Sequence, residues 1–241
     1  MGRDFEAVDE LHVTATPDEV WAAIATGPGI DSWFMGRNDV DPGQTVRQAF
    51  GGYEPAYPVT AWEPGKRLAY GGDRGPDGRF VAFEFLIEGR DHGSTVLRVV
   101  NSGFLPGDDW ADEFEAMTKG GALFMNTLAT YLDNFAGRFA TPITAFGPMI
   151  TDWPRTRAKL FEAIGRTGDR VRFTPDGLPP VDGVVYFENE DVLGIRAEDA
   201  LYRFMRGFRG PVMACHHIFS DTSQEAAEKA WVDWLNAKDL T

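Results

Sequence analysis

The feature that most limits the fold is a series of short alternating segments followed by one long amphipathic segment. In "VAFEFLIE" the apolar residues Val81, Phe83, Phe85 and Ile87 share one face, because successive side chains of a strand point to opposite sides. Gly and Pro separate most of the segments, as in an antiparallel meander. Strands are predicted at residues 4–14, 45–50, 57–63, 67–71, 79–88 and 95–104. Their apolar face needs a cover.

The predicted cover is a helix over residues 108–135. Its large apolar residues recur at helical spacing: Trp110, Phe114, Met117, Leu123, Phe124, Leu128, Tyr131, Leu132 and Phe135. Gly120 and Gly121 interrupt the pattern, at a cost of about 1 kcal/mol each relative to alanine. Such a cost indicates a close approach, a kink or a bound group.

A short helix is expected between the first two strands. Thr16 is a suitable N-cap, Pro17 suits the first helical position and Glu19 adds favourable charge to the first turn. The tripeptide 27–29, Gly-Pro-Gly, should end this helix, and the aromatic pair Trp33 and Phe34 follows directly.

Four stretches carry a family resemblance: "TPDEVWAAIATGPGIDSWF", "VTAWEPGKRLAY", "STVLRVVNSGF" and "LATYLDNF". They resemble the bacterial branch of the Hsp90-ATPase-activator-homologue family, within the START-like (SRPBCC) superfamily. The resemblance spans residues 5 to 135 and implies an α+β helix-grip domain at 1–140, an antiparallel sheet wrapped on a long C-terminal helix. Relatives usually carry Gly-Trp near the middle of that helix, whereas this chain has Gly120-Gly121. The resemblance therefore implies that a group which normally fills the space beneath the helix is missing, so that the cavity is either larger in this chain or filled from elsewhere.

Residues 141–241 are interpreted as a second, shortened helix-grip-like copy. An offset of 125 residues places Val59 on Val184, Leu68 on Leu193, and "GQTVRQAF" on "GDRVRFTP". A larger offset places Pro17 on Pro154, so the second copy lacks the loop that holds the aromatic pair. The alternative is an unrelated α+β tail.

The resemblance implies a binding groove between the sheet and the long helix. Its expected ligand-binding residues are Trp33, Phe34, Phe83, Phe85, Leu97, Asn101, Phe114, Met117, Gly121 and Met125. The aromatic pair is expected either to form a lid over the groove or to plug the end of the core. Asn101 is expected either to orient a ligand carbonyl or to bond local backbone.

Other chemistries have little support in the sequence. In "CHH" a strand would place Cys215 and His217 on one side and His216 on the other, too few ligands for zinc. Nucleophile elbows, P-loops and dinucleotide fingerprints are absent, and the acidic runs read as solvated turns and helix starts. We therefore expect no catalytic residue, no metal and no cofactor.

Composition limits the partners. The 37 acidic and 23 basic residues give a formal charge of −14, which would repel nucleic acid and anionic membranes. No apolar run reaches membrane-spanning length, and a single cysteine excludes an intrachain disulfide. We expect a cytoplasmic protein, and a monomer because two fused copies can replace a homodimer.

Three functions are compatible with these features. The first is non-catalytic binding of a small apolar or amphipathic molecule in the groove. The second is a protein-interaction role resembling the Hsp90 activators, in which the acidic surface engages a basic protein partner. The third is an enzyme resembling the cyclase or aromatase members of the superfamily, which the shortage of polar groups disfavours.

Overall fold

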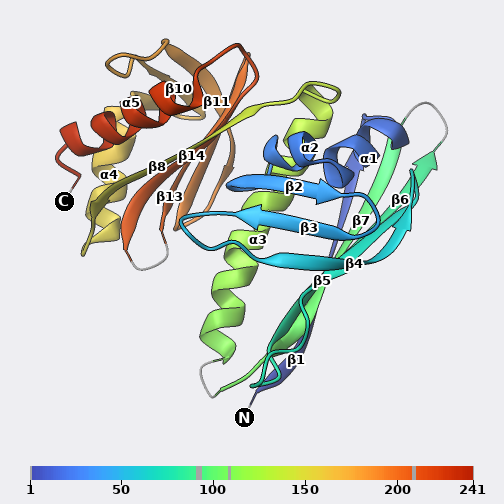
Figure 1. The fold of residues 1–241 in the computed structure, drawn as a ribbon. Coiled ribbons are helices and arrows are strands. Elements are labelled where there is room, and N and C mark those ends of the chain that lie inside the picture. The colour runs from blue at the N-terminus through green and yellow to red at the C-terminus, as the bar shows by residue number, and fades with distance from the viewer. Residues whose placement is uncertain (1, 91–93, 108–109, 208–209, 241) are drawn as a thin grey trace. The chain divides into compact units, whose positions relative to one another are not determined.

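The chain forms two compact units, Met1–Phe139 (unit 1) and Ala140–Thr241 (unit 2). The computed structural model describes residues 2–90, 94–107, 110–207 and 210–240, apart from the side chains of 90, 110–113 and 115–117. Each unit contains one seven-stranded antiparallel sheet (Figure 1). The turn expected near residues 90–94 lies partly outside the described residues.

Unit 1 follows the predicted element order, with two additions. Its elements are β1 (Arg3–Val13), α1 (Pro17–Ala25), α2 (Gly27–Asp31), β2 (Arg37–Asp41), β3 (Thr45–Ala49), β4 (Ala56–Glu63), β5 (Arg67–Gly71), β6 (Phe80–Arg90), β7 (Ser94–Leu105) and α3 (Trp110–Asn134). The sheet order is β1-β7-β6-β5-β4-β3-β2, so β1 pairs with the last strand and the rest form a meander. The sequence reading missed α2 and β2.

The capping signals around α1 act as predicted. Thr16 and Glu19 form a capping box, and Pro17 occupies the first turn. The following Gly-Pro-Gly, however, does not only end α1: Thr26 is both the C-cap of α1 and the N-cap of α2. Pro28 then lies in the first turn of α2, where its missing N–H costs nothing.

Unit 2 repeats the order of unit 1 in shorter form. Its elements are β8 (Thr141–Met149), α4 (Trp153–Ala163), β9 (Arg166–Thr167), β10 (Arg170–Phe173), β11 (Val181–Glu188), β12 (Val192–Ala197), β13 (Ala200–Arg206), β14 (Pro211–Ile218) and α5 (Gln224–Ala237). The sheet order β8-β14-β13-β12-β11-β10-β9 matches that of unit 1 strand for strand. The described part of unit 2 has no counterpart of α2. This arrangement is consistent with two helix-grip-like copies.

Strand register refines the alignment of the copies. Leu68 and Leu193 are both buried, and each pairs with a residue just beyond a β-bulge in the neighbouring strand. The two leucines therefore occupy equivalent positions, as the offset of 125 residues predicts. In β4 and β11, however, the bulges start at Val59 and Val185, so the alignment of Val59 with Val184 is wrong by one residue. A bulge can shift local register without changing the order of strands.

The core of unit 2 is an aromatic cluster between the sheet and α5. Trp231 and Trp234 of α5 pack on Phe173, Tyr202 and Phe204 of the sheet, with ring centroids 5.5 to 6.3 Å apart. Both indoles are 2% exposed. Interlocked rings of this size leave little room between the sheet and α5.

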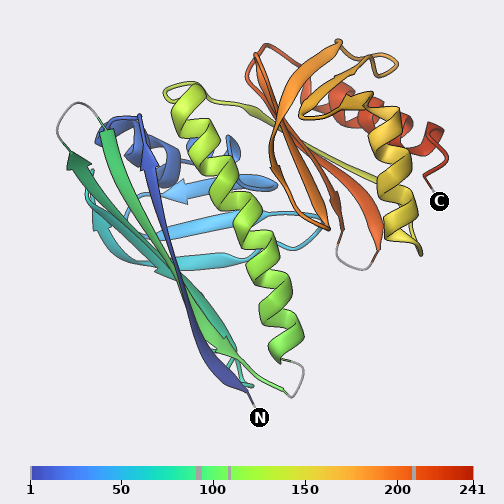
Figure 2. The same ribbon diagram turned by 180° about the vertical axis from the view of Figure 1, so that it is seen from behind.

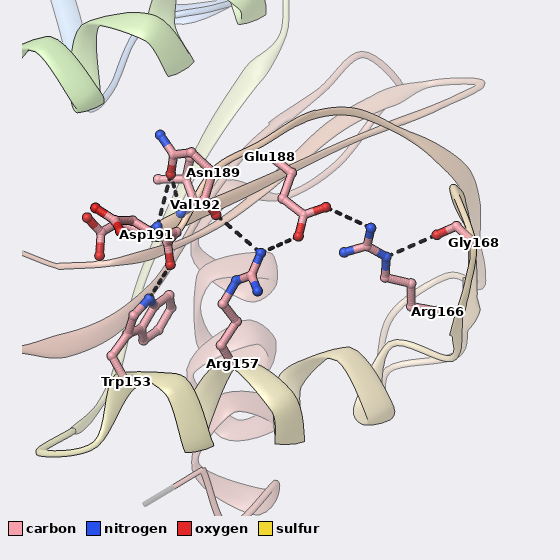
Figure 3. A network of polar contacts seen from close by, with 9 residues as sticks. Trp153, Arg157, Arg166, Gly168, Glu188, Asn189, Asp191 and Val192 are labelled. Atoms are coloured by element: carbon pink, nitrogen blue, oxygen red, sulfur yellow. Dashed lines mark hydrogen bonds and ion pairs between the residues drawn. The ribbon is translucent and has the colours of Figure 1, made fainter.

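A polar network joins α4 to the sheet of unit 2 (Figure 3). Glu188 at the end of β11 accepts hydrogen bonds from Arg157 of α4 and from Arg166 of β9, the latter at 2.7 Å. Both guanidinium groups also lie 4.5 Å from the ring centroid of Phe161. The hydrogen bond from Arg166 is the main cause that lowers the pKa of Glu188. The sequence reading of this acidic run as a solvated turn missed the network.

Candidate functional site

The aromatic pair of unit 1 lies in a tightly packed segment that begins with α2. A Cβ atom added to Gly29 would lie 2.0 Å from the carbonyl oxygen of Ala22, and one added to Gly27 would lie 2.5 Å from that of Asn38. Both glycines are therefore needed for α2 to approach α1 and β2 this closely.

A buried carboxylate holds the far end of the same segment. Asp31 accepts hydrogen bonds from the backbone N–H of Asn38 at 2.7 Å and from its side-chain amide at 3.0 Å. Burial raises the pKa of Asp31, while Asn38 and the guanidinium of Arg37, 3.7 Å away, act in the opposite direction. The segment is thus fixed on both sides of the aromatic pair.

The two aromatic residues have different surroundings. Trp33 is 3% exposed, and its indole N–H donates to the backbone oxygen of Ala23 at 3.0 Å. Phe34 is half-buried and lies 4.5 Å, centroid to centroid, from Phe124 of α3. Trp33 is therefore part of the core, while Phe34 links the segment to the long helix.

Four of the expected wall residues share the sheet face that α3 covers. Phe83 pairs with Asn101, and Ile87 pairs with Leu97, so β6 and β7 present Phe83, Phe85, Leu97 and Asn101 on one side. Asn101 also pairs with Ala7 of β1, which places Phe5 on the same face. The ring of Phe5 lies 5.6 Å from that of Phe114 of α3. Figures 1 and 2 show α3 lying across this sheet.

Two contacts fix the direction of α3 along β1. Phe5 contacts Phe114, and the backbone N–H of Thr14 donates to Asp133 at 2.8 Å. The strand advances about 30 Å between its two contacts, at roughly 3.3 Å per residue. The helix advances about 28 Å between its own, at roughly 1.5 Å per residue. The lengths agree, so α3 and β1 run side by side in the same direction.

Because α3 and β1 run in the same direction, the position of Gly121 along β1 can be derived. Gly121 lies about 10 Å along α3 from the first contact, which is level with the stretch of β1 between Ala7 and Asp9. Those two residues pair with Asn101 and Val99 of β7. Gly121 is therefore above the middle of the expected wall.

Gly121 faces the sheet and has open space in front of it. It is seven residues from both Phe114 and Leu128, and residues seven apart lie on nearly the same side of a helix. Leu128 is fully buried and Phe114 contacts the sheet. In the described part of the chain, a Cβ atom added to Gly121 would meet no heavy atom within 4 Å, and the same is true of Gly120. The close approach considered for this glycine pair is therefore wrong, and α3 is one continuous helix.

Asn101 presents an unsatisfied polar atom on this face. Its side-chain Oδ1 is buried and has no hydrogen-bond partner among the described residues. The expected bond to local backbone is therefore not made by Oδ1. By contrast, the buried hydroxyl of Thr95 on the same strand donates to the backbone oxygen of Ala15 at 2.6 Å. A buried acceptor without a donor is uncommon in native proteins and suggests a missing partner.

The remaining expected residues divide into core and rim. Phe85 and Leu97 are buried, whereas Phe83, Phe114 and Met125 are half-buried. The side chain of Met117 lies outside the described set. The sequence reading did not select Phe124 for the site, although its position three residues after Gly121 placed it beside the same stripe.

The structure also places the residues considered for other chemistry. As expected, His216 lies on the α5 side of β14, whereas Cys215 pairs with Thr144 toward the opposite side. Burial raises the pKa of Cys215 to about 11, so its thiol is a poor nucleophile. In the described part of the chain, no group of three or more His, Cys, Asp or Glu side chains is arranged to hold a metal ion. Within the same residues, no helix is both long and apolar enough to cross a membrane.

Searches of protein-family models and of curated proteins find no match to this chain. Several solved structures are similar to it. Protein MLL2253 from Mesorhizobium loti is 25% identical, with a TM-score of 0.46 over 54% of this chain and 98% of its own. Aha1 from Colwellia psychrerythraea is 20% identical, with a TM-score of 0.45 over 54% and 96%. DynU16, from the dynemicin biosynthetic locus, is 19% identical, with a TM-score of 0.43 over 98% and 96%.

These TM-scores are low, so the description of the fold rests on strand order and helix placement. Among its described residues, the chain is an α+β protein of two seven-stranded antiparallel sheets and five helices.

Proposed function

We propose that unit 1 binds a small amphipathic molecule between its sheet and α3, with the apolar wall against its body and Asn101 against its polar group. The observation that carries the proposal is the unpartnered Oδ1 of Asn101 on the face that also holds open space at Gly121. Leaving a buried acceptor unpaired costs about 1–3 kcal/mol, which a ligand with an O–H or N–H would recover.

The surrounding side chains favour binding over catalysis. Phe83, Phe85, Leu97 and Phe114 supply apolar area and no group that titrates near neutral pH. The amide of Asn101 holds a hydrogen bond but neither takes up nor releases a proton under ordinary conditions. An apolar surface with one polar group can fix the orientation of an amphipathic molecule, which is what a binding site needs.

Native mass spectrometry of the protein purified from its own host tests the proposal. We expect a non-covalent small molecule that is present under native conditions and lost on denaturation. Gly121→Leu should fill the space and remove this mass, whereas Asn126→Leu, at an exposed position of the same helix, should keep it. Absence of any ligand, together with no binding of long-chain alcohols, fatty acids or aromatic probes, would overturn the proposal.

A further inference from the structure

Equivalent strands of the two units have a polar residue at the same position. Leu68 and Leu193 are equivalent residues of the two units. Leu68 pairs with Phe85 of β6 and Leu193 pairs with Phe204 of β13, so Phe85 and Phe204 are equivalent as well. Phe85 pairs in turn with Val99, and Phe204 with Ala214. Two residues further along β7 and β14 are Asn101 and His216.

The equivalence extends to the flanking strands and to burial. Asn101 pairs with Ala7 of β1, and His216 pairs with Ile143 of β8, the corresponding first strand of unit 2. Both side chains face the long helix of their own unit. His216 Nδ1 accepts from the backbone N–H of Arg203 at 3.0 Å, whereas His216 Nε2 is buried without a hydrogen-bond partner among the described residues. Each copy thus has an unsatisfied polar atom at the same place.

What lies above that place differs between the units. In unit 2 the indole of Trp231 contacts His216 edge to face, with ring centroids 4.3 Å apart, and also contacts Tyr202 and Phe204. In unit 1 the corresponding level of α3 is Gly121, where an added Cβ atom would meet no heavy atom of the described residues within 4 Å.

Helix spacing is compatible with the same correspondence. Trp231 is followed by an aromatic ring three residues later and an apolar residue four residues later, Trp234 and Leu235. Gly121 is followed in the same way by Phe124 and Met125. The same spacing also occurs at Leu128, which is followed by Tyr131 and Leu132, so the match of Gly121 with Trp231 rests on strand register and the helix pattern only agrees with it.

Resting on the proposed function of unit 1, we infer that its ligand is a flat, bicyclic aromatic molecule with an N–H or O–H on its edge, and that Trp231 occupies the equivalent place in unit 2. The indole of Trp231 shows the shape that this fold accommodates between sheet and helix. The Oδ1 of Asn101 supplies the acceptor that such a donor needs.

Three probes of similar size separate ring shape from donor. Indole is flat and carries an N–H, 1-methylindole is flat without a donor, and 1-octanol carries an O–H on a flexible chain. For the wild-type protein, isothermal titration calorimetry should show indole binding about tenfold more tightly than 1-methylindole, because only indole donates to Asn101. Octanol should bind more weakly than indole, because its chain loses more conformational freedom.

Two substitutions test the equivalence of Gly121 and Trp231 by closing the proposed site in unit 1 and opening the equivalent place in unit 2. Gly121→Trp should abolish indole binding by unit 1, whereas Asn126→Trp, at an exposed position of the same helix, should reduce it by less than about threefold. Trp231→Gly should open unit 2, so that a second indole molecule binds per chain. Circular dichroism checks the fold of each variant, and the wild-type probe series remains decisive if a variant fails to fold.

The outcomes separate this inference from the proposed function. Octanol binding as tightly as indole, still blocked by Gly121→Trp, would overturn the ligand class and leave a binding site in unit 1. Indole binding that persists unchanged in Gly121→Trp would overturn the equivalence of Gly121 and Trp231. If none of the three probes binds and no ligand co-purifies, both proposals fail.

Discussion

Asn101 carries a buried side-chain oxygen that has no hydrogen-bond partner among the described residues. Replacing it with leucine removes the buried unpaired acceptor, so Asn101→Leu should raise the free energy of unfolding of the ligand-free protein by about 1 kcal/mol. Urea denaturation measures the change. The control is Thr95→Val on the same strand, which should lower stability because it removes a satisfied hydrogen bond. A comparable loss in both variants would mean that Oδ1 is satisfied in solution.

His216 makes unit 2 sensitive to mild acid. Burial is the main cause that lowers its pKa well below 6.5, and the charge of Arg203 acts in the same direction. The folded protein keeps this imidazole neutral, whereas the unfolded chain takes up a proton below about pH 6.5. Stability from this group is therefore full above that pH and falls as the pH drops, by up to about 1.4 kcal/mol per pH unit.

The measurement is urea denaturation across about pH 5 to 7.5, the window set by this shift. His216→Asn is the matched variant, because it places the residue of unit 1 at the equivalent position of unit 2. Its stability should depend less on pH in that range. An unchanged pH dependence would exclude His216 as the source.

At the scale of elements, the glycines of unit 1 serve opposite purposes. Gly29 allows α2 to touch α1, so Gly29→Ala should lower the free energy of unfolding by about 2 kcal/mol or more. Gly120 lies in the middle of α3 with open space around it, so Gly120→Ala should raise stability by about 0.5–1 kcal/mol. Thermal denaturation of both variants compares them, and a destabilised Gly120→Ala would contradict the open space.

The polar network of unit 2 holds α4 to the end of β11. Glu188 is 27% exposed and bonds two arginines, so Glu188→Gln should lower the stability of the protein at neutral pH by about 1 kcal/mol, allowing for partial solvent screening. Because its folded pKa is lowered, this contribution is present above the usual pKa of 4.5 and is lost as the pH falls through the folded value. Urea denaturation at neutral pH and near pH 3 checks both statements; equal losses at the two pH values would contradict them.

The elements that could be predicted are those whose signals are local. The capping box at Thr16 and the alternation in β6 depend only on neighbouring residues, and the structure contains both. By contrast, α2 and β2 could not be predicted because their contacts are long-range: Gly27 packs on Asn38, and Asp31 binds the same residue. The one-residue error between β4 and β11 has a similar cause, since a bulge leaves no clear mark in the sequence.

The site was predictable in part. Strand parity placed Phe83, Phe85, Leu97 and Asn101 on one face, and register confirms this. The replacement of Gly-Trp by Gly120-Gly121 already indicated a missing bulky group beneath α3, but the unpaired Oδ1 of Asn101 was not predictable, because it depends on how far α3 stands from the sheet. That distance is set by side chains along the whole helix.

For the whole molecule, the two units should differ in local stability. Strands β7 and β14 occupy the same position, each between the first strand and the sixth strand of its sheet. Rings fill the space above β14, whereas the space at Gly121 lies above β7. Hydrogen–deuterium exchange near Asn101 should therefore be at least about tenfold faster than near His216. Equal rates in the ligand-free protein would show that the packing difference has no effect.

The side chain of Trp231 makes unit 2 an internal control for binding experiments on unit 1. Under the proposed function, a probe that binds to unit 1 changes the signals of unit 1, whereas unit 2, where the ring of Trp231 occupies the equivalent place, responds only to solvent and temperature. One labelled sample therefore yields the titration and its baseline together, without a separately prepared inactive protein.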